Sequence, residues 1–184
     1  MTTPTPTPAP APAWWAPDGP WAQRNLDVAL PDDDPDLVAS VAGGLVAAGV
    51  ERGDRVSWQL PNGRDAIALY RACWRIGAVA APVHHRAGPA DAEALRRRID
   101  PALFVAEGDE LPSGAPVPRG SVPVAPTDVA VALATSGSTG TPKLAHHTHR
   151  ALAHKAEVMA GVHGLGAGDC HLLAAPLAHI SGLL

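Results

Sequence analysis

A continuous apolar segment at residues 129–134 limits most strongly what this chain can fold into. Such a run is typical of a strand that is buried on both faces of a sheet. Both faces are then covered by helices, and helices that join parallel strands form crossover connections. The segment therefore indicates an α/β fold in which a mostly parallel sheet is flanked by helices.

Helices and strands alternate along the rest of the chain, as this fold class requires. An N-cap at Asp34 followed by Pro35 starts the first expected helix. A second helix is expected to place Ile67, Tyr70 and Trp74 on one face and to end at Gly77. Two more helices are expected, at residues 89–99 and from Thr148 to about residue 159. The other expected strands are residues 56–60, 78–83, 103–106 and 170–174.

The two ends of the chain differ from its middle. Residues 1–20 alternate Pro with Thr and Ala, a pattern that predicts an extended and solvated tail. Residues 21–184 are expected to form the N-terminal part of one domain. The last residues, 180–184, are apolar and carry no polar cap, so we expect the domain to be truncated at this end.

Composition excludes several classes of partner. The formal net charge is 14 − 18 = −4, which gives no general attraction to nucleic acid or anionic membranes. No run of about 18 apolar residues is present, so no segment is expected to span a bilayer. Cys73 and Cys170 lie far apart in apolar segments, which fits a reducing compartment, and we expect a cytoplasmic protein.

Residues 135–147, which directly follow the apolar run, are expected to be a loop, and its first part is rich in glycine and hydroxyl groups. Its glycines allow backbone N–H groups to approach an anion, its hydroxyls add donors, and its lysine adds a mobile positive charge. A flexible linker would need neither the buried strand before it nor the Pro-Lys pair that closes it. The pattern therefore predicts a phosphate-binding loop that consists of Thr135, Ser136, Gly137, Ser138, Thr139, Gly140, Thr141, Pro142 and Lys143.

Two familiar nucleotide-binding loops do not fit this spacing. A Walker A loop needs Gly, four intervening residues and then Gly-Lys-Ser/Thr, whereas here Lys143 follows Pro142 and precedes Leu144. A dinucleotide fingerprint needs Gly-x-Gly-x-x-Gly, and this loop lacks it. The loop therefore belongs to a different class of phosphate site.

The loop TSGSTGTPK, together with two later motifs, resembles the adenylate-forming superfamily. That group contains acyl-CoA synthetases, the adenylation domains of peptide synthetases, and luciferases. The later motifs are Thr148-His149 and PLAHISGL at residues 176–183. Weaker upstream blocks are GDRV at residues 53–56, LPN at residues 60–62 and RIGAV at residues 75–79. The resemblance covers roughly residues 35–184.

This resemblance implies an AMP-forming acyl-CoA synthetase that uses ATP, Mg²⁺ and CoA and acts on a small carboxylic acid, a chemistry associated with fatty acid metabolism. Residues 135–143 would hold the outer phosphates of ATP, and His179 and Gly182 would border the acyl pocket. Leu144 departs from the family, which usually has Gly after the Pro-Lys pair. The family's catalytic and magnesium-binding residues are expected downstream of Leu184. Neither the acid nor the oligomeric state is indicated.

Three other functions remain open at the level of the sequence. The chain could be an adenylation domain that loads a carrier protein, or an inactive fragment. A serine hydrolase with Ser138 as nucleophile is a weaker alternative, because Ser136 replaces the first glycine of the Gly-x-Ser-x-Gly elbow. Its triad would need Asp169 with His171 or His179.

Histidines gather in two further places, which are an expected turn at His84 and His85 and the junction between the loop and the helix that starts at Thr148. The chain lacks carboxylate or cysteine ligands at a suitable spacing beside them, so solvated side chains are favoured over a metal site. The histidines concerned are His84, His85, His146, His147, His149 and His154.

Overall fold

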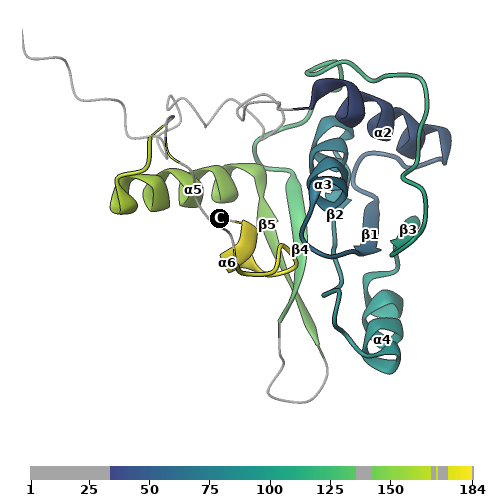
Figure 1. The fold of residues 1–184 in the computed structure, drawn as a ribbon. Helices are drawn as coiled ribbons and strands as arrows, with labels where there is room; N and C mark the ends of the chain where they lie inside the picture. Colours follow the sequence, from purple (N-terminus) through teal and green to yellow (C-terminus); the bar gives the residue numbers. More distant parts are fainter. Residues whose placement is uncertain (1–33, 136–141, 167–168, 170–173, 184) are drawn as a thin grey trace, which may run out of the picture.

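A computed structural model describes residues 34–135, 142–166, 169 and 174–183, so the tail predicted at residues 1–20 lies outside it. Five strands form one sheet in the order β3-β1-β2-β4-β5 (Figure 1). All neighbouring pairs are parallel except β4 and β5, which are antiparallel. The predicted α/β class with a mostly parallel sheet is therefore confirmed. The strands are β1 Arg55–Gln59, β2 Val79–Ala80, β3 Leu103–Ala106, β4 Val129–Thr135 and β5 Lys143–Thr148.

Helices cover both faces of this sheet. The helices are α2 Pro35–Ala47, α3 Arg64–Ile76, α4 Pro89–Ile99, α5 His149–His163 and α6 Ile180–Leu183. Strand β4 shows the two faces, because Val131 and Leu133 join the core beneath α2 and α3, whereas Ala132 joins the core beneath α4. The apolar run at residues 129–134 is thus buried from both sides, as its sequence predicts.

Local signals set the ends of the helices as expected. The Asp34 carboxylate accepts a hydrogen bond from the backbone N–H of Leu37 at 3.4 Å, directly before the first turn of α2. The Thr148 hydroxyl accepts one from the N–H of Ala151 at 3.2 Å at the start of α5. Helix α3 ends at Gly77, whose φ of 75° is the left-handed conformation that glycine adopts most easily.

Three aromatic side chains form the centre of the larger core. The Tyr70 ring meets Trp58 edge-on at 4.8 Å between centroids and lies 5.6 Å from Trp74. Ile67, predicted to share their buried face, is instead 51% exposed. It lies at the first turns of α3, where it lines a hollow of about 430 Å³ between α2 and α3 together with Leu37. The predicted face is therefore correct for Tyr70 and Trp74 and wrong for Ile67.

Two glycines of α2 allow a neighbouring strap of chain, residues 112–115, to lie directly against the backbone of the helix. A Cβ added to Gly43 would lie 2.0 Å from the carbonyl oxygen of Ala115, and one added to Gly44 would lie 2.2 Å from the nitrogen of Ser113. Gly114 donates a hydrogen bond to the carbonyl of Ser40 at 3.0 Å. The segment that joins β3 to β4 is thereby fixed against α2.

Several boundaries differ from the sequence-based prediction. Helix α5 continues to His163 rather than ending near residue 159, because Gly164 supplies the left-handed stop with a φ of 64°. Strand β2 is only Val79–Ala80, although the N–H groups of Ala81 and Val83 still donate to β1 carbonyls at 2.9 and 2.8 Å. Of the strand expected at 170–174, residues 170–173 lie outside the described residues.

The stretch expected as a loop at residues 135–147 contains strand β5, so that prediction is wrong. Leu144 pairs with Ala134 in the antiparallel ladder and packs, partly buried, against the core beneath α4. Its apolar side chain stabilises a strand here, although the following histidines are poor strand signals. In the part of the chain that the structure describes, no helix is both long and apolar enough to cross a membrane.

Candidate functional site

The predicted phosphate loop begins and ends at one place on the sheet. Thr135, the last residue of β4, pairs with Lys143, the first residue of β5. The Thr135 hydroxyl donates to the Lys143 carbonyl at 3.4 Å, and both side chains are exposed. Pro142 is half-buried. The remaining six positions, Ser136, Gly137, Ser138, Thr139, Gly140 and Thr141, lie outside the described residues.

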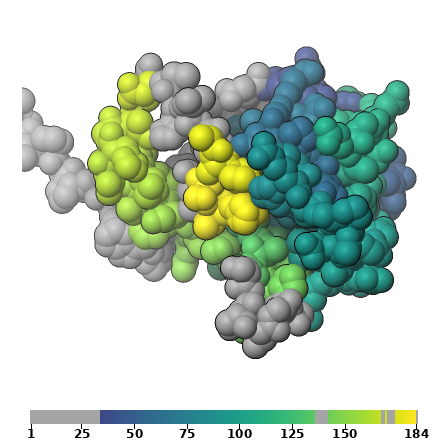
Figure 2. All heavy atoms as spheres, turned by 60° about the horizontal axis from the view of Figure 1, so that its bottom comes forward, coloured from purple at the N-terminus to yellow at the C-terminus, as the bar shows by residue number. Residues whose placement is uncertain are grey.

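This loop emerges at the carboxyl ends of the parallel strands, where open α/β sheets bind ligands. Two other connections reach the same edge: Leu60–Asn62 of the LPN block follows β1, and the histidine pair follows β2. Figure 2 views the molecule from this end and shows residues 174–183 in yellow between α5 on one side and the teal residues of the sheet and its helices on the other. The structure thus brings the PLAHISGL motif to the same end of the sheet as the loop.

Asn62 fixes the motif that carries His179. Its side-chain N–H donates to the carbonyl of Ala175 at 2.8 Å, and its side-chain oxygen accepts from the N–H of Leu177 at 2.8 Å. The hydroxyl of buried Tyr70 donates to the Leu177 carbonyl at 2.6 Å. Burial raises the pKa of Tyr70, so the hydroxyl stays protonated and remains a donor.

Gly182 is needed for close packing within this motif. A Cβ at this position would lie 2.1 Å from the carbonyl oxygen of Pro176, a distance that no real side chain tolerates. The N–H of Gly182 donates to the carbonyl oxygen of His179 at 3.0 Å. The N–H of His179 donates to the carbonyl oxygen of Pro176 at 3.0 Å. The observed role of Gly182 is therefore to close the turn that presents His179, whose side chain is exposed.

His179 meets the histidine pair that follows β2. Its ring lies 5.5 Å from that of His84, which stacks on His85 at 4.7 Å with an interplanar angle of 18°. The turn predicted at His84 and His85 is present, but these side chains form a cluster rather than separate solvated groups. No sequence signal connects them with His179, because about 95 residues separate them and the rings meet only in the folded chain.

The other predicted histidines differ in exposure, and His147 and His154 are half-buried. His146 is exposed on β5, as expected, whereas His149 is fully buried and its ring faces Trp74 edge-on at 6.5 Å. Burial lowers the pKa of His149 to about 4, and the nearby Asp128 carboxylate only partly opposes this shift. The prediction of a solvated side chain is therefore wrong for His149. This residue is the first of α5, and its ring packs against Trp74 of α3.

The described residues do not provide a metal centre. Within them, no group of three or more His, Cys, Asp or Glu side chains is placed so that it could hold a metal ion. The Asp169 carboxylate, a candidate triad member, accepts a hydrogen bond from the N–H of Gly166 at 2.7 Å. The candidate nucleophile Ser138 lies outside the described residues.

The fold and this edge define an α/β protein of the kind that binds ligands at the carboxyl ends of parallel strands. The sequence model of the AMP-binding enzyme family matches residues 35–119 and 100–184, so the chain belongs to that family. The predicted membership in the adenylate-forming superfamily is confirmed.

Individual relatives agree with this assignment. The chain is 33% identical over 165 residues to a feruloyl-CoA synthase from Amycolatopsis sp, covering 79% of this chain and 33% of the relative. It is 31% identical over 140 residues to the pyochelin synthetase PchE of Pseudomonas aeruginosa, covering 70% of this chain and 10% of the relative. The chain therefore spans about a third or less of the length of these relatives.

A solved structure shows the same fold. The complex of VinN with 3-methylaspartate superposes with a TM-score of 0.63 at 28% identity, and the match covers 73% of this chain and 44% of VinN.

Proposed function

We propose that the protein carrying this chain is an ATP-dependent, AMP-forming acid–thiol ligase that produces an acyl-CoA. The observation that supports this most is the meeting of two motifs at one sheet edge. The ends of the phosphate loop, Thr135 and Lys143, and the segment that presents His179 come from distant parts of the sequence. Family membership and the similarity to a feruloyl-CoA synthase support the same chemistry.

In this proposal the loop at residues 135–143 binds the outer phosphates of ATP. A carboxylate oxygen of the acid attacks the α-phosphorus, the bond to the bridging oxygen breaks, and pyrophosphate leaves with acyl-adenylate remaining. The loop's donors and the exposed ammonium of Lys143 stabilise the charge that develops on pyrophosphate. Positioning and charge stabilisation are the main contributions that a protein can make to such a transfer.

The acyl group then moves to a thiol. The sulfur attacks the acyl carbon, the bond to the AMP phosphate oxygen breaks, and AMP leaves while the thiol loses its proton. His179, with Gly182 closing its turn, is proposed to border the acyl pocket. Magnesium would neutralise the phosphates, but the described residues offer no group that fits a metal ion, so no step is assigned through it.

Loading of a carrier protein is the second candidate. The similarity to a pyochelin synthetase over 70% of this chain favours it, because the acid-activating chemistry would be the same and only the thiol acceptor would differ. The two candidates are distinguished by whether free CoA accepts the acyl group. Neither relative is named for a fatty acid, so the class of acid is tested rather than assumed.

The experiment is a stoichiometry measurement on the purified protein that contains this chain. With ATP, Mg²⁺, CoA and a panel of aromatic, aliphatic and dicarboxylic acids, one acid should release AMP, pyrophosphate and acyl-CoA in equal amounts. Release of AMP and pyrophosphate with no acyl-CoA would favour the carrier-protein candidate. Release of ADP, or no turnover with any acid, would overturn the proposal.

A further inference from the structure

Gln59, the last residue of β1, holds a turn of the neighbouring segment through its side chain. Its half-buried amide nitrogen donates to three backbone carbonyl oxygens, which are those of His84 at 3.4 Å, His85 at 3.4 Å and Ala87 at 3.1 Å. Since all three of these neighbours are acceptors, the nitrogen of the amide must face them rather than its oxygen. The turn therefore defines the orientation of the Gln59 side chain.

The turn begins directly after the backbone pairing with β1. The N–H of Val83 donates to the Trp58 carbonyl at 2.8 Å, and the N–H of Ala87 donates to the His84 carbonyl at 2.9 Å, which closes a β-turn over residues 84–87. The N–H of Arg86 also donates to Nδ1 of His84 at 3.0 Å, so the His84 ring is fixed to the backbone of this turn. The position of the ring therefore follows the position of the turn that the Gln59 side chain attaches to β1.

The other half of the ring contact is anchored to the same part of the chain. Asn62, in the loop after β1, bonds to the backbone of Ala175 and Leu177 and so holds the segment that carries His179. The His179 ring lies 5.5 Å from the His84 ring, with an interplanar angle of 52°. Two side-chain amides within residues 59–62 thus hold the two segments, and the distance between the rings depends on both.

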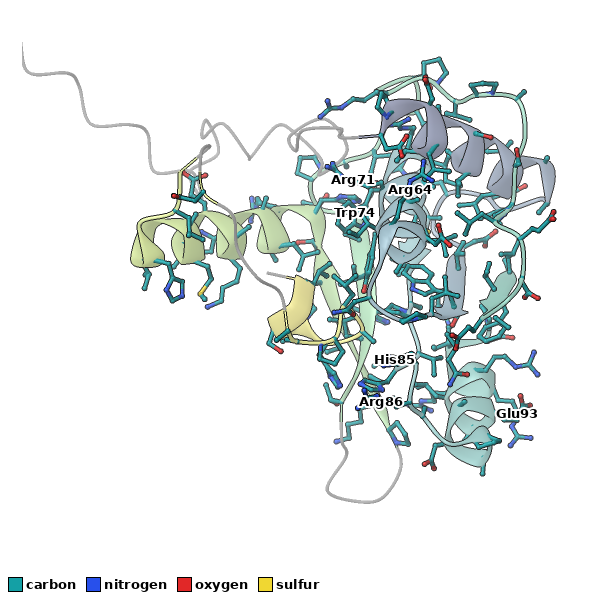
Figure 3. All side chains as sticks on the ribbon, in the orientation of Figure 1. Arg64, Arg71, Trp74, His85, Arg86 and Glu93 are labelled. Atoms are coloured by element: carbon teal, nitrogen blue, oxygen red, sulfur yellow. The ribbon has the colours of Figure 1, made fainter. Side chains whose placement is uncertain are left out.

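We propose that Gln59 is a positioning residue for the acyl site, because it holds the turn at residues 84–87 so that the His84 ring supports His179. Figure 3 shows His85 and Arg86 of this turn together below α6. The link to the acyl group rests on the proposed function, which places His179 at the border of the acyl pocket. A wall that is already ordered lowers the entropy cost of binding the acid. Releasing the turn should therefore weaken binding of the acid and leave binding of ATP unchanged.

Two substitutions at residue 59 remove the donor. Gln59→Leu replaces the amide with an apolar group of similar size and leaves the three carbonyl oxygens without this hydrogen bond. Gln59→Glu is isosteric, but its carboxylate would set acceptor against acceptor, so it should release the turn at least as strongly. Gly44→Ala is the matched control for lost stability, because its new Cβ would lie 2.2 Å from the Ser113 nitrogen, on α2 rather than at the histidines.

The first measurement follows the two rings directly in the purified protein that contains this chain. With isotope-labelled histidine, a nuclear Overhauser cross-peak between the ring protons of His84 and His179 reports their contact, and the other histidine signals report whether the fold is kept. The cross-peak should be present in the parent and in Gly44→Ala, and it should be lost in both Gln59 variants. Its absence from the parent, or an unchanged cross-peak in both Gln59 variants, would overturn the proposal.

The second measurement separates positioning from stability, with the acid that the ligase assay turns over. Gln59→Leu should raise KM for that acid about tenfold, roughly the effect of losing one hydrogen bond, and should leave KM for ATP within about twofold. Gly44→Ala should change neither value. An equal rise in both KM values, or the same rise in Gly44→Ala, would show a structural role alone and overturn the proposal. If no acid is turned over, the ligase function fails by itself, and the ring contact still decides whether Gln59 positions His179.

Discussion

Asn62 holds Leu177 in place through a hydrogen bond of 2.8 Å from the Leu177 N–H to the Asn62 side-chain oxygen. The same side chain donates to Ala175, and the Tyr70 hydroxyl donates to the Leu177 carbonyl. A residue from the loop after β1 and one from α3 thus fix a segment more than 100 residues away. This contact explains why the weak LPN block accompanies the PLAHISGL motif.

Asn62→Ala should destabilise the chain by about 1–3 kcal/mol, because it removes two hydrogen bonds and leaves the Leu177 N–H without its acceptor. Asn62→Asp keeps the acceptor and loses the donor, so its effect should be intermediate. Urea unfolding of the three proteins measures the order. Equal stability of the alanine variant and the parent would show that this contact does not hold the segment.

Gly44→Ala should destabilise the chain, because the new Cβ would lie 2.2 Å from the Ser113 nitrogen and would push the strap away from α2. Overpacking of this kind costs roughly 1–3 kcal/mol. Gly161→Ala is the matched control within α5, where a Cβ meets nothing within 4 Å. It should stabilise the chain by about 0.5–1 kcal/mol. Thermal melts of both variants that shift in the same direction would contradict the close approach.

His149 should make stability depend on pH in a known direction. Its pKa in the folded chain is about 4, below the ordinary value of 6.5, so the unfolded chain binds the proton more readily between these values. Stability is therefore full above pH 6.5 and is lost as the pH falls towards 4, by about 3 kcal/mol from this group.

His149→Phe keeps a ring against Trp74 and removes the titration, so its free energy of unfolding should change less between pH 7 and pH 4 than that of the parent. Urea unfolding at several pH values gives both profiles. The exposed His163→Gln variant serves as the control and should keep the parent slope. Parallel profiles for His149→Phe and the parent would refute the assigned burial effect.

The alternation of elements could be predicted from sequence because each signal is local. The cap at Asp34, the stop at Gly77 and the apolar run of β4 act within a few residues of their own positions. Strand β5 was missed because its ladder to β4 is a tertiary contact, and only Leu144 marks it in the sequence. A local pattern cannot report pairing that depends on a neighbouring strand.

The candidate site shows the same contrast between local signals, which the sequence carries, and tertiary contacts, which it does not. Residues 135–143 and His179 were predicted through motifs, whereas the contact of His179 with His84 depends on the tertiary hydrogen bonds that hold residues 175–177. His149 was expected to be solvated because it lies between a loop and a helix and no metal ligands stand at a suitable spacing beside it. Its burial follows from its position at the start of α5, facing Trp74 of α3.

The most direct test of the central claim is acid-dependent exchange of pyrophosphate into ATP by the protein that contains this chain, measured in Lys143→Ala and Lys155→Ala variants. Lys143→Ala removes a charge-assisted contact to phosphate worth on the order of 1.5–3 kcal/mol, so exchange efficiency should fall about ten- to a hundredfold. Lys143→Arg should recover only part of it. Lys155, exposed on α5, should tolerate alanine. Equal exchange by the two alanine variants, or a Lys143 defect explained by unfolding in a parallel thermal melt, would contradict the assignment of this loop as the phosphate site.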